Sequence, residues 1–254
     1  MWGDSIHFGY WPDPTDDNIS IAEAQQLFTD LLISHLKLEP GQRLLDVGCG
    51  TGRPAVQIAR KTGAHVTGIT VSRSQVELAT DYARTSGMGD RVHFERISAM
   101  EMPYADATFD AAMAFESIFH MDRARVCEQM VRVVRPGGRV VIADGVLYSP
   151  MTDEQREIIY RGFEVTELAY VEDYIRDMKA AGLTGITCLD VTLNTMMPTI
   201  DRSLALLRSG ACHDRLREAY TDEEIAMFLE GWEATRQINR QSFAYAVLVG
   251  EKPL

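Results

Sequence analysis

The sequence predicts an α/β protein in which helices cover both faces of a mostly parallel sheet. Short apolar runs typical of strands alternate with amphipathic stretches typical of helices between residues 43 and 144. This alternation indicates successive βαβ units. A glycine-rich turn at 48–52 follows the first of these runs, and Pro54 restarts the chain as a helix. Because glycine lets the backbone turn sharply and approach a ligand closely, this turn is the first candidate binding site.

The core elements are predicted from hydrophobic spacing and from residues that stop helices. Ser20 to Leu38 carries apolar residues three and four apart, as an amphipathic helix does, and Pro40-Gly41 ends it. Strands are then expected at 43–47, 65–70, 91–97, 109–115 and 138–144, and helices at 54–61, 73–86 and 122–135. Glycines at 63, 87 and 137–138 stand where these helices should stop.

The C-terminal part continues the pattern with two interruptions. The expected additions are a helix at 171–181, a strand near 185–191 and a closing strand at 242–250. They bring the sheet to about seven strands, which is near the usual sheet size. The segments 145–170 and 195–240 fit the alternation poorly and carry helical patches. We expect them to be helical lid insertions that shape a substrate pocket.

Composition and charge narrow the class of ligand. The chain has 254 residues, of which 46% are hydrophobic and 24% charged, as is ordinary for one large globular domain. Its formal net charge of −12 opposes binding to nucleic acid, because phosphates attract clustered Lys and Arg. We therefore expect a small-molecule ligand and no nucleic acid.

The cysteines and the N-terminus predict the compartment. The four cysteines are scattered, with no C-x-x-C pair and no histidine at metal-ligand spacing. We expect reduced thiols and no metal site. The first residues lack the charged and apolar regions of a signal peptide, and no apolar run is long enough for a membrane span. The expectation is a cytoplasmic protein without membrane insertion.

The glycine turn is part of a longer motif. The run is Leu44-Leu45-Asp46-Val47-Gly48-Cys49-Gly50-Thr51-Gly52. It resembles motif I of the class I S-adenosylmethionine-dependent methyltransferases, which implies a Rossmann-like fold and S-adenosyl-L-methionine as cofactor. A dinucleotide-binding enzyme has its third glycine three residues after the second, at the position that Arg53 holds here. A nucleotide-binding dehydrogenase or a non-catalytic binding protein remains the alternative from a different class.

The resemblance assigns the methionine end of the donor to the first strand. Gly48, Cys49 and Gly50 would pack against its carboxypropyl part. Asp46, near the end of the strand, would either orient the turn or contact the amino group directly. Both roles remain open at this point.

The ribose and adenine are assigned to the next two strand ends. Residues 70–75 resemble a T-x-S-x-x-Q variant found in cyclopropane-forming lipid enzymes and antibiotic sugar O-methyltransferases. Thr70 and Gln75 would bond the ribose in place of the family's usual carboxylate, and Ser72 is expected to cap the following helix. Ser98-Ala99-Met100 resembles the segment around the adenine, with Ser98 where the family has Asp.

The N-terminal segment also resembles the family. Ile6-His7-Phe8-Gly9-Tyr10-Trp11 is similar to an H-F-G-Y-W segment of antibiotic and sterol or tocopherol methyltransferases, where it covers the cofactor. Tyr10 would then lie near the sulfonium, whose charge favours an aromatic face; aromatic core packing is the competing interpretation. We expect a single domain with a covering segment at 1–40, a cofactor-binding core at 41–147 and acceptor-site insertions with the remaining strands at 148–254.

Candidate catalytic residues follow the fourth and fifth strands. Histidine exchanges protons near neutral pH, so His120 is the candidate general base, with a helix cap or a packed side chain as its alternative. Asp144 would orient His120 or act as the base itself, and a solvated strand-end carboxylate is its alternative. Glu116, in the stretch where the family faces cofactor and substrate, is expected to contact the cofactor.

These residues predict an enzyme that transfers a methyl group to a hydroxyl of a small molecule. The acceptor class is a secondary metabolite or its sugar, as in antibiotic biosynthesis. The nearest alternative is a C- or N-methyltransferase acting on a lipid, terpenoid or other natural product, in which Glu116 and Tyr10 would stabilise a cation. A homo-oligomer is compatible with the sequence.

Overall fold

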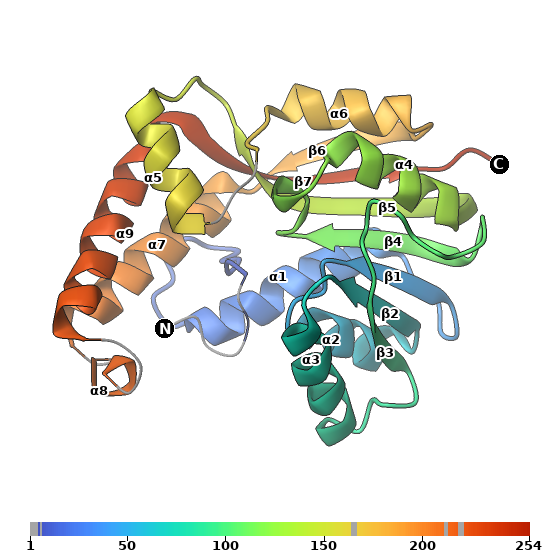
Figure 1. Cartoon of the computed structure of the whole chain (residues 1–254), viewed down its shortest axis with the longest axis horizontal. Coiled ribbons are helices and arrows are strands. Elements are labelled where there is room, and N and C mark those ends of the chain that lie inside the picture. Colours follow the sequence, from blue (N-terminus) through green and yellow to red (C-terminus); the bar gives the residue numbers. More distant parts are fainter. Residues whose placement is uncertain (1–4, 6, 164–166, 211–212, 218–220) are drawn as a thin grey trace.

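The structure is a computed structural model that describes residues 5, 7–163, 167–210, 213–217 and 221–254. In this part of the chain seven strands form one sheet, with helices on both faces (Figure 1). The strands are β1 (Arg43–Val47), β2 (His65–Thr70), β3 (Val92–Arg96), β4 (Phe109–Phe115), β5 (Val134–Leu147), β6 (Thr184–Asp190) and β7 (Phe243–Glu251).

The strand order is β3-β2-β1-β4-β5-β7-β6. β7 pairs antiparallel with β5 and β6, and the other neighbouring strands pair in parallel. The predicted seven-stranded, mostly parallel Rossmann-like sheet is therefore confirmed. The order reverses between β1 and β4, so the carboxyl ends of these two strands border a crevice where ligands of this fold class bind.

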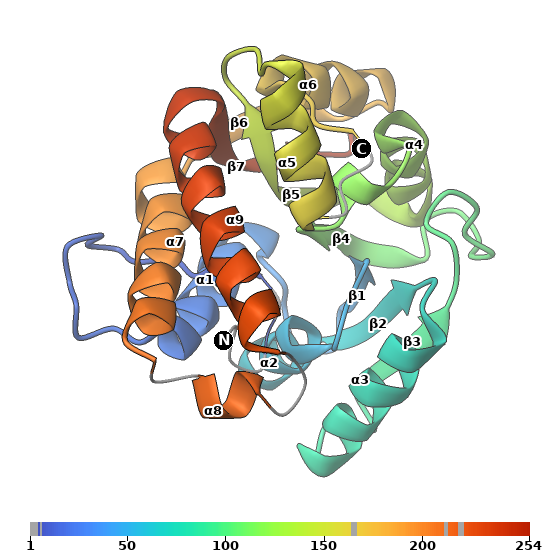
Figure 2. The ribbon, with the colours of Figure 1, turned by 60° about the vertical axis from the view of Figure 1, so that its left-hand side comes forward.

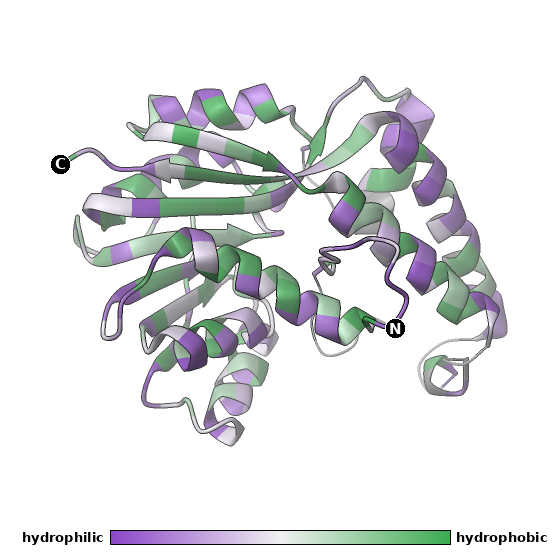
Figure 3. Ribbon diagram, turned by 180° about the vertical axis from the view of Figure 1, so that it is seen from behind, coloured by the Kyte–Doolittle hydropathy of each residue, from purple (hydrophilic) through white to green (hydrophobic). Residues whose placement is uncertain are grey.

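Helices form two layers around the sheet. One face carries α1 (Ile21–Leu36), α2 (Arg53–Thr62) and α3 (Arg73–Thr85), and the other carries α4 (Arg123–Val133) and α6 (Val171–Ala180). Strand residues alternate between the two layers: Leu44 packs in one apolar cluster and Leu45 in the other. Because both faces are covered, apolar residues run along the strands (Figure 3).

Most predicted boundaries hold within one or two residues. Ser20 and Ser72 cap α1 and α3 by accepting hydrogen bonds from the Glu23 and Gln75 amides, which confirms the structural role predicted for Ser72. The prediction that Gly137 and Gly138 end a helix is wrong. α4 ends at Val133, and both glycines lie within β5.

A helical cap stands at the carboxyl ends of the parallel strands (Figure 2). Its helices are α5 (Asp153–Phe163), α7 (Thr192–Arg208), α8 (His213–Leu216) and α9 (Asp222–Ser242). The described part of the predicted insertion at 145–170 thus contains one helix, α5, and the first three residues of that insertion still belong to β5, whereas α7, α8 and α9 make up most of the described part of 195–240. None of the helices in the described ranges has an apolar stretch long enough to cross a membrane.

Candidate active site

The turn after β1 is held by backbone hydrogen bonds to the neighbouring strand. The Gly48 and Cys49 amides donate to the Ile69 carbonyl at 2.9 and 3.0 Å. Gly48, Gly50 and Gly52 have φ values of 75°, 52° and 76°, in the left-handed region that side-chain-bearing residues rarely adopt. The local sequence therefore determines this bend, and Pro54 follows in the first turn of α2.

Gly48 also allows two strand ends to approach closely. A Cβ at this position would lie 2.3 Å from the Ser117 Cβ. Ser117 follows β4, and its hydroxyl donates to the Val47 carbonyl at 2.7 Å. The absence of a side chain at Gly48 thus lets the residue that follows β4 pack directly against the turn after β1.

Asp46, beside the turn, has a buried carboxyl oxygen that lacks a hydrogen-bond partner among the described residues. It is 2% exposed, and its Oδ2 has no hydrogen-bond partner in the described part of the chain. Burial raises the pKa of Asp46 to about 7. A buried acceptor without a partner is costly, so this carboxylate suits a ligand that brings a donor or a positive charge.

A cleft opens above the turn and gathers six of the predicted site residues. These are Asp46, Gly48, Cys49, Gly50, Glu116 and His120. Residues that were not predicted to be in the site complete the lining: Ser5, His7, Thr51, Pro54, Phe115 and Phe119. The cleft therefore joins the glycine turn to the end of β4, as the switch-point rule predicts.

The predicted ribose and adenine residues lie outside this lining, at the ends of β2 and β3. Thr70 is 7% exposed and donates to the Gln75 side chain at 2.6 Å. Ser98 accepts from the Met100 amide at 3.4 Å, Ala99 is buried, and Met100 is 43% exposed. Because β1, β2 and β3 are adjacent and parallel, these residues continue the same edge of the sheet.

Tyr10 packs away from the cleft lining. Its ring centroid lies 6.0 Å from that of Phe28, a fully buried residue of α1, and its amide donates to the Ala24 carbonyl at 2.9 Å. This packing corresponds to the competing interpretation offered for the N-terminal aromatic residues. A contact between Tyr10 and the cofactor stays a prediction, and residues 1–4 and 6 of the covering segment lie outside the described residues.

Glu116 is the most constrained acidic residue of the cleft. Its φ of 49° is unusual for a residue with a side chain. Its Oε1 accepts from the Phe8 amide at 2.9 Å and from the Tyr245 hydroxyl at 2.7 Å. Burial raises the pKa of Glu116 to about 7, against the opposite effect of these two hydrogen bonds. Strained backbone of this kind persists where surrounding contacts hold it.

His120 and Asp144 occupy different environments. His120 ends η1 (Ile118–His120), is exposed, and lies against Phe119 with ring centroids 4.3 Å apart. Asp144 is 1% exposed and accepts from the Tyr174 hydroxyl of α6 at 3.0 Å. The structure forms no hydrogen bond between the Asp144 and His120 side chains. Asp144 lies behind the cleft wall, and its role as a base stays a prediction.

Asp144 is connected to the cleft by a hydrogen bond from the backbone of Phe119, which lines the cleft. Burial raises the pKa of Asp144 well above its usual value, and the Phe119 amide is among the groups that counteract this effect. Asp144 therefore lies beneath the turn that carries His120. The sequence placed both residues at strand ends, but the direction of each side chain depends on the packing of α6 and η1.

Two functional neighbours carried weak sequence signals. His7 lies in the N-terminal segment of residues 6–11. Its side chain is 5% exposed, and its ring centroid lies 4.3 Å from that of Phe115. Tyr245 lies in β7, where its sequence neighbours give no sign of a role beyond the strand. Its hydrogen bond to Glu116 spans 129 residues, so no local pattern could have predicted it. Among the described residues, no group of three or more His, Cys, Asp or Glu is arranged to hold a metal ion.

Comparison with known proteins relates the chain to methyltransferases. Residues 44–138 match a family model described as a methyltransferase domain. The whole chain is 38% identical to the methyltransferase GfsG of Streptomyces halstedii, covering 89% of that protein. It is 34% identical to (+)-O-methylkolavelool synthase of Herpetosiphon aurantiacus, with 99% of this chain and 88% of that protein covered.

A solved structure extends the likeness. The 4+2 cyclase SpnF is 31% identical, with a TM-score of 0.79, and the match covers 98% of this chain and 89% of that one. This architecture thus also occurs in a protein named for a different reaction. The fold alone therefore does not determine the reaction, which depends on the residues of the site.

Proposed function

This chain belongs to the S-adenosylmethionine-dependent methyltransferases that act on small molecules, and from that premise we propose that it methylates a hydroxyl of a secondary metabolite or of its sugar. The observation that carries this proposal is the shared cleft: the glycine turn and the exposed His120 line one space. A donor on the turn and a base beside it are the two requirements of methyl transfer to a hydroxyl.

The residues of the turn fit the methyl donor. S-adenosylmethionine supplies an electrophilic methyl group on a sulfonium. Asp46 offers an unpartnered buried carboxylate oxygen to the donor's amino group, and Gly48, Cys49 and Gly50 line the cleft beside it. Thr70 with Gln75, and Ser98 with Ala99 and Met100, are the residues proposed for the ribose and the adenine further along the same edge.

His120 is proposed to remove the proton of the acceptor hydroxyl. An aliphatic hydroxyl is a weak nucleophile until a base accepts its proton during attack, and such assistance contributes about 10²–10⁴-fold. Alignment of the two reactants contributes more, up to about 10 kcal/mol. We therefore expect a variant without the base to keep residual turnover, because the cleft still aligns donor and acceptor.

The helical cap is proposed to select the acceptor. α5, α7 and α9 stand over the carboxyl ends of the strands, beyond the cleft (Figure 2). Insertions at this edge of an α/β sheet are where substrate specificity is usually built. An O-methylated natural product in the name of one relative supports a hydroxyl of a similar compound as the acceptor.

Methylation of carbon is the second candidate, and Glu116 is the observation that favours it. A carboxylate in the cleft wall is suited to stabilise the cation that forms when a carbon acceptor is methylated. The position of the new methyl group, read by NMR of the product, distinguishes the two. A methyl on oxygen supports the first proposal, and a methyl on carbon replaces it with the second.

The test is a methyl-transfer screen with donor carrying a labelled methyl group, against a panel of glycosylated and aglycone metabolites. With the acceptor so identified, His120→Ala should lower kcat by about 10²–10⁴-fold and leave the Kd for S-adenosylhomocysteine within about twofold. His65→Ala is the matched control, because His65 is an exposed residue at the amino end of β2, on the opposite edge. Unchanged kcat in His120→Ala would remove His120 from the mechanism.

A further inference from the structure

Residues 7–12, called the strap below, run between the cleft and the cap. On the cleft side, the Phe8 amide donates to Glu116 Oε1 at 2.9 Å. His7 lines the cleft together with the glycine turn. Burial lowers the pKa of His7 to about 4, so at neutral pH it presents an uncharged ring to this space. The strap therefore forms one wall of the proposed donor site.

On the cap side, α7 holds the next residues of the strap. The Gly9 amide donates to Thr199 Oγ1 at 3.1 Å, and Thr199 is fully buried. The Trp11 amide donates to the Asn194 carbonyl at 2.7 Å, and the Asn194 side chain donates back to the Trp11 carbonyl at 2.8 Å. Hydrogen bonds that span more than 180 residues thus fix this backbone to the cap.

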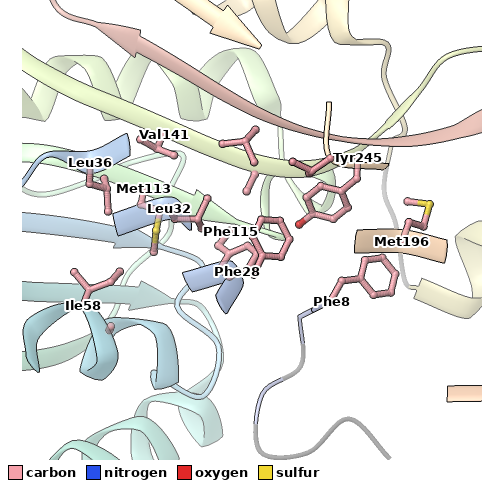
Figure 4. Close-up of a cluster of buried hydrophobic side chains, with 14 of the residues drawn as sticks. Phe8, Phe28, Leu32, Leu36, Ile58, Met113, Phe115, Val141, Met196 and Tyr245 are labelled. Carbon is pink, nitrogen blue, oxygen red and sulfur yellow. The ribbon is translucent and has the colours of Figure 1, made fainter. Parts of the chain in front are cut away.

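Packing leaves the strap little freedom between these two attachments. Figure 4 shows the Phe8 ring beside Met196 of α7. The Phe8 and Tyr245 ring centroids are 6.0 Å apart. A Cβ on Gly9 would lie 2.7 Å from the Ala24 Cβ and from the Trp11 ring. The strap therefore fits one position, which is set by its hydrogen bonds and by α1 beneath it.

The hydrogen bonds of the Glu116 carboxyl among the described residues all go to one of its two oxygens. Oε1 accepts the Phe8 amide and the Tyr245 hydroxyl, whereas the described residues provide no hydrogen bond to Oε2. Burial raises the pKa of Tyr245 well above its usual value, so this hydroxyl stays protonated and can donate. The left-handed backbone at Glu116 is held by these contacts and by its own amide, which donates to the Ala143 carbonyl at 2.8 Å.

We propose that Glu116 is a positioning residue for the methyl donor, acting through the Phe8 amide to hold the strap against the donor site, with Thr199 as its counterpart on the cap. This inference rests on the proposed donor site at 48–52. It assigns to Glu116 an effect on donor retention that operates through the strap, in addition to any direct contact that its Oε2 makes in the cleft.

The first measurement is the Kd for S-adenosylhomocysteine by calorimetry on the full chain. Glu116→Ala leaves the Phe8 amide without its acceptor, and a lost buried hydrogen bond of this kind weakens binding by about tenfold. Glu116→Gln keeps an acceptor oxygen at the same place, so its Kd should stay within about twofold of the unsubstituted chain. In a Trp2→Phe/Trp232→Phe background, which leaves Trp11 as the one tryptophan of the sequence, acrylamide quenching of fluorescence reports the strap. Trp11 is fully buried and should become accessible in Glu116→Ala but not in Glu116→Gln.

A second substitution tests the other attachment. Thr199→Val removes the hydroxyl that accepts from Gly9 and should weaken donor binding and expose Trp11 as Glu116→Ala does. The double variant should be no more than about twofold weaker than either single variant, because both act on one segment. Thr62→Val is the matched control: Thr62 Oγ1 also accepts a backbone amide, from Ala64 at 3.1 Å, and donates to a helical carbonyl at 2.8 Å. It should leave the Kd unchanged.

Three outcomes separate the possibilities. Equal Kd values for Glu116→Ala and the unsubstituted chain overturn the inference. Weakened binding in both Glu116→Ala and Glu116→Gln, with Trp11 still protected, also overturns it and indicates direct contact of the carboxylate with the donor. Failure of the unsubstituted chain to bind S-adenosylhomocysteine contradicts the proposed donor site itself. Circular dichroism confirms that each variant is folded before binding is measured.

Discussion

The two walls of the cleft are built in different ways. The wall proposed to hold the methyl donor, called the donor wall, comes from one continuous stretch, residues 46–54, in which glycine conformations and backbone hydrogen bonds to Ile69 set the geometry. The opposite wall combines the strap, Glu116 at the end of β4, Tyr245 on β7 and α7. The first wall is determined locally, whereas the second exists only when distant parts of the chain meet.

This difference predicts which changes each wall tolerates. A substitution in the donor wall acts through the space available to the backbone. A substitution in the opposite wall acts through hydrogen bonds and buried charge.

Gly48→Ala should damage the donor wall most. Its Cβ would lie 2.3 Å from the Ser117 Cβ at a φ of 75°, and crowding plus left-handed strain together cost about 2–5 kcal/mol. We expect loss of S-adenosylhomocysteine binding in calorimetry and a lower Tm. Gly41→Ala is the control, since Gly41 has a φ of 83° and no atom within 4 Å of the added Cβ. If Gly48→Ala and Gly41→Ala bind S-adenosylhomocysteine equally well, crowding at Gly48 does not control donor binding.

The stability of the ligand-free protein should fall as pH rises from about 4 to 7, between the ordinary pKa of an Asp carboxyl and the raised pKa of Asp46. A carboxyl whose pKa is raised on folding binds its proton more tightly in the folded state, so its favourable contribution is lost as pH increases through the folded pKa. Asp46, with a pKa raised to about 7, contributes up to about 4 kcal/mol to this loss. Asp46→Asn should flatten the slope in urea unfolding at several pH values. An unchanged slope would show that Asp46 is already charged in the folded state at pH 5.

The Asp46 carboxylate should also make the affinity for the donor depend on pH, with the opposite sign to its effect on stability. If Asp46 meets the amino group of the donor, its charged form binds better. The affinity for S-adenosylhomocysteine should then decrease as pH falls below about 7, and Asp46→Asn should remove that dependence. A pH-dependent affinity that persists in Asp46→Asn would assign the effect to another group, such as Glu116.

Substitutions of Asp144 test the buried hydrogen bond behind the opposite wall. Asp144→Ala leaves the Tyr174 hydroxyl without its acceptor, which costs about 1–3 kcal/mol of unfolding free energy. Asp144→Asn keeps an acceptor and should be nearly as stable as the unsubstituted chain at pH 6. Because Asp144 is 1% exposed, Asn should also retain kcat within about tenfold, below the 10²–10⁴-fold of a lost base. A larger loss would give Asp144 a part in catalysis, either as the base or through the turn that carries His120.

Ser72→Ala is expected to have the smallest effect. Ser72 caps α3 by accepting from the Gln75 amide, and loss of such a cap costs about 1 kcal/mol. The affinity for S-adenosylhomocysteine should not change, because the role is structural. A weakened affinity without a change in Tm would instead place Ser72 in contact with the donor.

The sequence predicted the elements of the core well because their signals are local. β1, the glycine turn and the capped start of α3 each follow from adjacent residues. The interpretation of Gly137 and Gly138 failed because the reason for a glycine there is tertiary. A Cβ on Gly138 would lie 2.4 Å from the Asp110 carbonyl oxygen, so this glycine allows β4 and β5 to pair closely rather than ending a helix.

The candidate site divides in the same way. By itself, the sequence determined the glycine turn, because glycine spacing dictates backbone conformation without help from distant residues, and its resemblance to motif I indicated the cofactor class. Only the tertiary structure decided that Glu116 accepts from Phe8 and Tyr245, that Asp144 lies behind the cleft and that His120 lies in it. Side-chain direction at a strand end depends on which helices pack against it, and those helices come from segments far away in the chain.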